Sequence, residues 1–395
     1  MGSIARACAF FSTRSIEDTA RATFGSYGTL IGLSVLCAAV AILQLYRLPA
    51  NPSWKMHRKF LLFTLLGCCI SAVNAIFRMN QVYYGIAATN LPKDQVLHYE
   101  YIALSRKYGA WFYITYPWET ACLMFAKLMV LERMGSFAVR GTVASSQLRQ
   151  WLRWNSRQLF LAAILLCNFI CICAYSAGAS YYFQDSELNS QQVSMTNISD
   201  PSVRSAYEIK SVAYYTSSSM CLSVQGFSES LMFLIVVISF CVVGLHVKKR
   251  IASMLDKLST VRGSAVVQNA HTTGRAIDRR VRIAVAFIFM SFILRFIWTF
   301  VNAVANQFPE NPACSFCSDC QSGGFILSAT LFYGGEVRSV VWMFSNPLAL
   351  LVSIIFMHPI SPKEQSSFIS APLMPAAHHG SAAAGGHISF CNASP

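Results

Sequence analysis

Charged residues are scarce in this chain. Of its 395 residues, 12% are Asp, Glu, Lys or Arg and 54% are hydrophobic, whereas a soluble domain carries about 25% charged residues. The apolar residues are gathered in runs close to 20 residues long, which is the length that a helix needs to cross a bilayer. The shortage of charge therefore excludes an ordinary soluble protein and indicates an integral membrane protein surrounded by a lipid bilayer.

Acidic residues are scarcer still, with 17 Asp and Glu against 31 Lys and Arg, a formal net charge of +14. A surplus of this size can indicate a nucleic-acid-binding protein. Here the basic residues lie in short segments between apolar runs, which is the distribution that membrane topology requires. We therefore exclude nucleic acid as a partner.

The apolar runs also lack the residues that several membrane chemistries need. No lysine lies between Phe325 and His358, which excludes a retinal Schiff base in the last run. All eight histidines lie in loops, tails or the ends of runs, so neither a haem or zinc centre nor a Ser-His-Asp arrangement can be placed inside a helix bundle. We expect no metal, no cofactor and no enzymatic activity.

Seven apolar runs remain, and each is long enough to cross a bilayer as a helix. They cover about residues 24–46, 59–78, 110–132, 158–182, 225–247, 282–305 and 338–358. The sequence therefore predicts an all-α fold, a seven-transmembrane helix bundle in residues 24–358. An N-terminal outer segment (1–23) precedes this domain, and a Ser-, Ala- and Gly-rich cytoplasmic tail (359–395), expected to be disordered, follows it.

The segments between the runs differ in charge. Together, the segments 47–59, 132–157 and 248–282 hold 18 basic and 3 acidic residues. The segments on the other side hold 8 basic and 10 acidic residues; they are 1–23, 79–109, 184–217 and 306–324. Because positive residues are retained on the cytoplasmic side, this asymmetry predicts an N-terminus outside or in a lumen and a cytoplasmic C-terminus.

Two charges lie deep inside the runs. Arg295 lies 13 residues beyond Arg282, the cytoplasmic end of its run, and hence about 20 Å into the membrane. Glu119 lies at about 21 Å in its own run. An unpaired guanidinium in lipid costs at least ~2.5–3.5 kcal/mol, so the matched depths predict an intramembrane pair of Glu119 and Arg295. Glu229 and Glu336 remain open as alternative partners.

Three further charges lie nearer the ends of their runs. Lys127 lies about 9 Å from the cytoplasmic edge and is expected to extend its amine to the interface. Glu336 and Arg338 are expected to form an interfacial pair at the outer edge of the last run.

The outer segments carry two signals of an oxidising compartment. Asn197 begins an Asn-Ile-Ser sequon, which predicts a glycosylation site. The sequence "CSFCSDC" contains Cys314, Cys317 and Cys320. It lacks the remaining ligands of an iron–sulfur or zinc motif. One local disulfide is therefore expected, with the third thiol either free or paired to Cys8 or Cys221.

Two local features resemble rhodopsin-type G-protein-coupled receptors. The third run ends in Glu132-Arg133, similar to the acidic-Arg pair of those receptors, and the seventh contains Asn346-Pro347, similar to the start of their Asn-Pro-x-x-Tyr. Leu350 stands in place of the tyrosine, and no proline follows Trp298. The resemblance implies that Glu132, Arg133, Asn346 and Pro347 act as a cytoplasmic switch or interface.

A second resemblance is to the plant tobamovirus-multiplication-protein family, a seven-span, receptor-like group. The stretches "LQLYRL", "SWKMHRKF" and "AVNAIFR" are similar to the order of its first two spans, and "FIFMSFILRFIWTF" is similar to its Phe-rich sixth span. Phe344 stands where that family has an acid. The resemblance implies an endomembrane of vacuolar or lysosomal type, the plasma membrane being the alternative, and small GTPases as partners.

These observations predict a non-enzymatic, receptor-like or scaffolding protein whose basic cytoplasmic face binds a signalling or trafficking partner. Lys248, Lys249 and Arg250 begin the most basic segment, in which the apolar residues follow helical spacing, as in a membrane-surface helix. A secondary transporter or channel that uses Glu119 and Arg295 is the alternative. The GxxxG pattern Gly28–Gly32 leaves a homodimer open.

Overall fold

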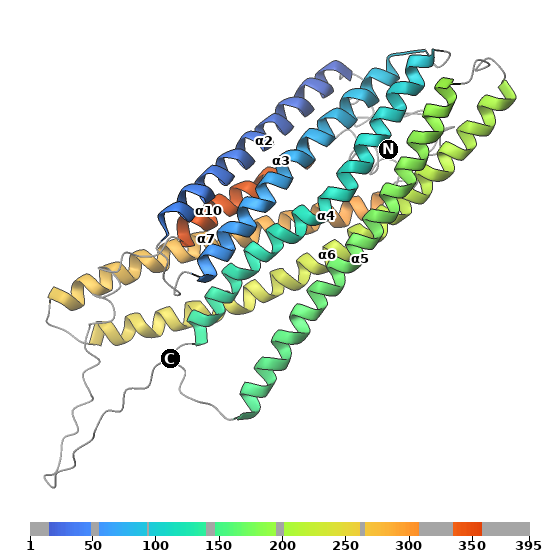
Figure 1. Cartoon of the computed structure of the whole chain (residues 1–395). Coiled ribbons are helices and arrows are strands. Elements are labelled where there is room, and N and C mark those ends of the chain that lie inside the picture. The colour runs from blue at the N-terminus through green and yellow to red at the C-terminus, as the bar shows by residue number, and fades with distance from the viewer. Residues whose placement is uncertain are drawn as a thin grey trace, which may run out of the picture.

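The described part of the chain is almost entirely helical. The computed structural model describes residues 16–48, 55–92, 95–139, 147–194, 201–260, 265–307 and 335–357, and no strand occurs in these ranges. The all-α prediction is confirmed for them. The elements are α2 (Ile16–Arg47), α3 (Lys55–Thr89), α4 (Val96–Val139), α5 (Gln147–Ser194), α6 (Pro201–Thr260), α7 (Ala265–Ala305), α9 (Gly335–Met343), η2 (Phe344–Leu348) and α10 (Ala349–Met357) (Figure 1).

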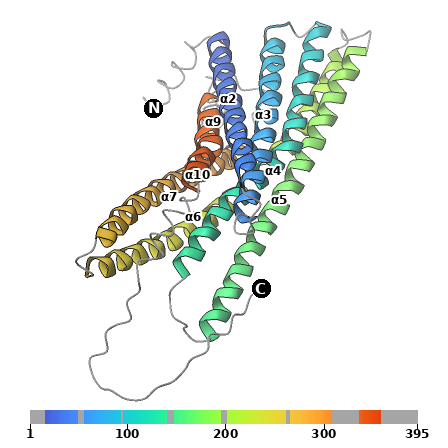
Figure 2. The same ribbon diagram turned by 60° about the vertical axis from the view of Figure 1, so that its left-hand side comes forward.

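Helices that follow one another along the chain lie side by side. From α2 to α7 each helix packs against the next one. The last helical segment, from α9 through η2 to α10, packs against both α2 and α7, and both views show it between these helices (Figures 1 and 2). This segment therefore joins the first helix of the bundle to the sixth long one.

Five helical segments are long and apolar enough to cross a membrane. They are Arg21–Arg47, Lys55–Ala88, Gln158–Val193, Ser205–His246 and Val285–Ala305. Arg338–Ile354 is apolar but shorter. The apolar part of α4 does not meet the same criterion, because it carries tyrosines, Pro117, Glu119 and Lys127 among its apolar residues.

The distribution of side chains is that of a membrane protein. Large apolar residues such as Leu36, Leu165 and Phe169 are exposed on the outside of the bundle, whereas Glu119 and Arg295 are buried. A lipid-facing surface needs no polar groups, and charges within a membrane face the protein interior. The chain is therefore a multi-pass helical membrane protein.

The helices continue well past the apolar runs. Much of the segments expected to be loops is helical, since α3 and α4 extend into 79–109, α5 and α6 into 184–217, and α6 and α7 into 248–282. Exposed polar residues do not interrupt the backbone hydrogen bonds of a helix, and few Gly or Pro residues occur there. At one end α6 and α7 project together and diverge from α5 (Figures 1 and 2).

Several sequence predictions lie outside the described residues. These are the N-terminal residues 1–15, Asn197, the three cysteines Cys314, Cys317 and Cys320, and the tail 359–395. The side chain of Glu336, and with it the expected pair with Arg338, also lies outside the described part. Cys221, which was left open as a disulfide partner, is a free thiol on α6. Gly28 and Gly32 lie exposed on α2, where an added Cβ would meet nothing within 4 Å, so they make no close helix contact within the bundle.

Candidate functional site: a buried layer of charge

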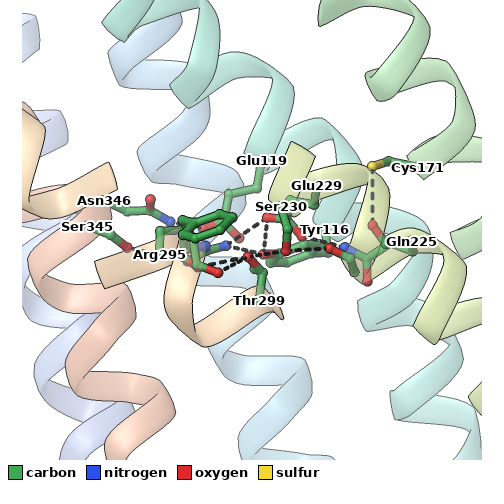
Figure 3. Close-up of polar contacts among 12 residues, drawn as sticks. Tyr116, Glu119, Cys171, Gln225, Glu229, Ser230, Arg295, Thr299, Ser345 and Asn346 are labelled. Atoms are coloured by element: carbon green, nitrogen blue, oxygen red, sulfur yellow. Dashed lines mark hydrogen bonds and ion pairs between the residues drawn. The ribbon is translucent and has the colours of Figure 1, made fainter. Parts of the chain in front are cut away.

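Arg295 lies at the centre of a buried polar layer formed by α3, α4, α6, α7 and η2 (Figure 3). Its Nη2 lies 3.5 Å from Oε1 of Glu229 and also donates to the hydroxyl of Tyr116. Tyr116 in turn donates to the same carboxylate oxygen at 3.0 Å. Arg295 and Glu229 are 2% and 1% exposed. The three groups form a closed triangle in which the tyrosine joins the cation to the anion.

The expected pairing of Arg295 with Glu119 is corrected by this geometry. Glu119 accepts from Nδ2 of Asn74 at 2.5 Å and from Nδ2 of Asn346 at 3.0 Å. Arg295 still acts on Glu119 electrostatically, but the ion pair forms with Glu229, the alternative that depth had left open. Depth along a helix does not fix rotation about its axis, and only rotation decides which of two acids a guanidinium meets.

Most of the remaining polar atoms around the ion pair also have partners, whereas Nε of Arg295 has none among the described residues. Gln225, one turn before Glu229, donates to its second carboxylate oxygen. Ser230 donates to Thr299 at 3.0 Å, and Thr299 donates to the backbone oxygen of Arg295 at 2.8 Å. Buried ion pairs are tolerated when such additional hydrogen bonds saturate their lone pairs and protons.

Lys127 was expected to extend its amine to the interface, but its side chain is buried in the bundle. It is 3% exposed, its Nζ donates to the backbone oxygen of Ser345, and it lies 4.7 Å from the ring centroid of Phe292. Its stem has therefore turned inward, where a carbonyl and an aromatic face stabilise the amine. With Lys127 included, the layer holds two bases and two acids, so its formal charge is balanced.

The π-helical turn η2 places the predicted Asn346-Pro347 pair against this layer. Pro347 has no N–H, and its ring displaces the carbonyl four residues earlier, so the helix widens locally. Both residues are buried. Asn346 reaches Glu119 from this turn, and the hydroxyl of Ser345 accepts from Nη1 of Arg295 at 3.4 Å.

The other predicted interface residues lie far from this layer. Glu132 is exposed on α4, about 20 Å along the helix from Glu119. Lys248 and Lys249 are exposed on α6, about 28 Å from Glu229. Arg133 and Arg250 lie on helices, but their side chains are outside the described part. Any effect of the central layer on these residues must therefore travel along the helices.

Sequence reasoning missed Tyr116 and Asn74. The sequence contains an indication for each of them. Tyr116 precedes Glu119 by three residues and therefore lies on the same face of α4. Asn74 is a single amide inside an apolar run, where an unpaired polar group is expensive. Searching each run for polar residues at the depth of its charges would have found them.

The comparisons with known proteins were negative. The chain matches no protein-family model, no curated protein and no solved structure. Among the described residues, no group of three or more His, Cys, Asp or Glu side chains is placed to hold a metal ion. The fold and the buried layer thus define a class, a multi-pass helical membrane protein with a charge-balanced polar core.

Proposed function

We propose that the chain is a non-enzymatic, receptor-like membrane protein whose basic cytoplasmic face binds a G protein or small GTPase. The observation that carries the proposal is the buried polar layer, which joins α3, α4, α6, α7 and η2 through named hydrogen bonds. Receptors require a core with two arrangements whose balance a ligand can shift.

The layer separates into two units that favour such a switch. One unit lies on α6 and α7 and holds the Arg295–Glu229 ion pair. The other lies on α3, α4 and η2 and holds Glu119 between Asn74 and Asn346. Tyr116 and Ser345 connect the two units. A shift of α6 and α7 would break these connections while leaving each unit paired, so neither arrangement would strand a buried charge.

The proposal includes seven spans, with α4 and the α9–α10 segment as the third and seventh. It places the N-terminus outside and the basic ends of α6 and α7 in the cytoplasm. The charge asymmetry of the connecting segments supports this orientation. An endomembrane location and a small GTPase as the partner rest on the resemblance of the first, second and sixth spans to the tobamovirus-multiplication-protein family.

Protease protection tests the orientation. A tag inserted at residues 261–264, between α6 and α7, is expected to be cut by protease added to the cytosolic side of intact membranes. A glycosidase shift that disappears in Asn197→Gln would support a lumenal position of that loop. Protection of the inserted tag would contradict the orientation.

Neutralising the basic face tests the partner. Each basic residue near an anionic surface contributes about 1 kcal/mol, so the combined change Lys248→Gln, Lys249→Gln and Arg250→Gln is expected to weaken binding more than tenfold. The measurement uses full-length protein in neutral-lipid nanodiscs and purified G proteins and small GTPases at several salt concentrations. A control variant, Lys107→Gln with Lys210→Gln, removes two exposed charges from the opposite side. Equal losses in both variants would contradict the proposal.

A transporter is the second candidate, favoured by one observation. The last helical segment widens into the π-helical turn η2 directly beside Glu119 and Lys127, and transporters bind substrates where a helix departs from regular geometry. Solute flux into proteoliposomes that is abolished by Glu119→Gln, together with no partner binding, would favour this candidate over the receptor.

A further inference from the structure

Two arginines lie on the outer side of the central layer with no described acid beside them. The guanidinium carbon of Arg78 on α3 lies 4.4 Å from the ring centroid of Phe112, and that of Arg338 on α9 lies 5.7 Å from the same centroid. The two cations repel each other. The Nε atom of each is buried without a hydrogen-bond partner among the described residues.

Aromatic side chains from four elements surround these guanidinium groups. Arg338 lies 4.6 Å from the ring centroid of Trp342, and Arg78 lies 5.8 Å from that of Tyr113. The buried aromatic residues of this cluster are Tyr27, Phe112, Tyr113, Tyr116, Tyr175, Tyr182 and Trp342. Their rings offer flat apolar walls, and the tyrosines add neutral hydroxyl groups.

The charge balance of this cluster differs from that of the rest of the bundle. The central layer has as many acids as bases, and Arg106 nearer the helix ends pairs with Asp185 at 2.8 Å. Arg78 donates only to the neutral amide oxygen of Gln81 among the described residues. Neither guanidinium group is paired with an acid among the described residues, and the two repel each other. A bound anion would offset this uncompensated positive charge.

The chemistry of the cluster indicates what kind of anion would fit. A guanidinium group binds a carboxylate through two parallel hydrogen bonds. Arg78 and Arg338 are both half-buried, so each leaves part of its surface uncovered by the described side chains. Aromatic walls with a few convergent polar groups are typical of small-molecule sites.

We propose that Arg78 and Arg338 form a binding site for a small aromatic carboxylate on the outer side of the bundle. The consequence of binding rests on the proposed receptor function, for which this site would supply the class of ligand. The path inward is short, because Trp342 stacks on Tyr116 with their ring centroids 5.4 Å apart. Tyr116 is one of the two residues that connect the two units of the central layer.

The experiment measures benzoate binding to the purified full-length protein in nanodiscs by saturation-transfer NMR and by thermal shift. Benzamide, the uncharged analogue, and empty nanodiscs are the controls. We expect saturable binding of benzoate that is at least tenfold tighter than that of benzamide. Arg78→Gln and Arg338→Gln should each weaken it at least tenfold, while Arg47→Gln, an exposed residue at the end of α2, should leave it unchanged.

Three acids whose side chains are not described could pair with these arginines: Glu310, Asp319 and Glu336. A variant in which all three are replaced by their amides tests this. Benzoate binding to that variant should be unchanged or tighter. If the Gln variants do not fold, Arg78→Lys and Arg338→Lys are used instead. They retain the positive charge but lose the two parallel N–H groups with which a guanidinium binds a carboxylate, so they should weaken binding several-fold. Absent or unselective benzoate binding, or affinity that the Gln or Lys variants leave unchanged, would overturn the site.

The outcome separates the site from the proposed function. If benzoate binds as expected but binding of G proteins and small GTPases is absent, the site stands and the receptor proposal fails. If partner binding to the basic face is found while benzoate does not bind, the site fails and the receptor proposal stands.

Discussion

Glu229→Gln and Arg295→Gln are each expected to reduce the folded yield of the protein sharply. Removing one member of a buried ion pair leaves the other charge uncompensated, which costs about 3–5 kcal/mol. The double variant should recover part of the yield, because neither charge then remains alone. Size-exclusion chromatography of detergent-solubilised protein, combined with thermal unfolding, measures both quantities.

A second cycle with Glu119 serves as the matched control. Glu119 lies in the same layer and is equally buried, but its carboxylate accepts from two amides and not from Arg295. The coupling free energy between Arg295 and Glu229 should therefore exceed that between Arg295 and Glu119. Equal couplings, or a larger one for Glu119, would contradict the pairing that the structure shows.

Gly226→Ala is expected to destabilise the protein, even though it adds only one methyl group. Gly226 lies on α6 against α7, and an added Cβ would lie 2.7 Å from Cβ and 3.1 Å from Cα of Ala303. The second of these is a backbone atom, so the two helices would have to separate. Overpacking of this kind costs about 1–3 kcal/mol, and thermal unfolding in one detergent measures it.

Gly32→Ala is the control for that substitution. An added Cβ on α2 at this position meets nothing within 4 Å, and replacing a helical glycine by alanine gains about 0.5–1 kcal/mol. The two variants should therefore change the unfolding temperature in opposite directions. A Gly226→Ala protein as stable as wild type would show that α6 and α7 do not approach so closely.

Part of this architecture could be predicted from the sequence because it depends on composition. The apolar runs predicted the positions of the helices. The depth of Arg295 in its run predicted that its side chain is buried and pairs with an acid. The identity of that acid could not be predicted, because Glu119 and Glu229 differ in the face of the helix on which they lie. That face is fixed only when the whole bundle packs.

The inward position of Lys127 was unpredictable for a related reason. Its distance from the interface allowed the amine to reach water, and nothing in the chain nearby indicated the carbonyl of Ser345, 218 residues away. The proximity of Arg78 and Arg338 could likewise not be predicted from the sequence. Arg78 ends an apolar run and Arg338 begins one, and only the structure brings both to the ring of Phe112.

The proposed switch requires the buried layer to control how α6 and α7 lie relative to α5 at the basic end of the bundle. Encoded spin labels at Gln158 on α5 and Lys249 on α6, both exposed, would report their separation in nanodiscs without disturbing the native cysteines. We expect two distance populations, with proportions that shift in Tyr116→Phe, because that change removes one of the two hydroxyl groups that connect the units. A single distance distribution that is identical in wild type and Tyr116→Phe would contradict it.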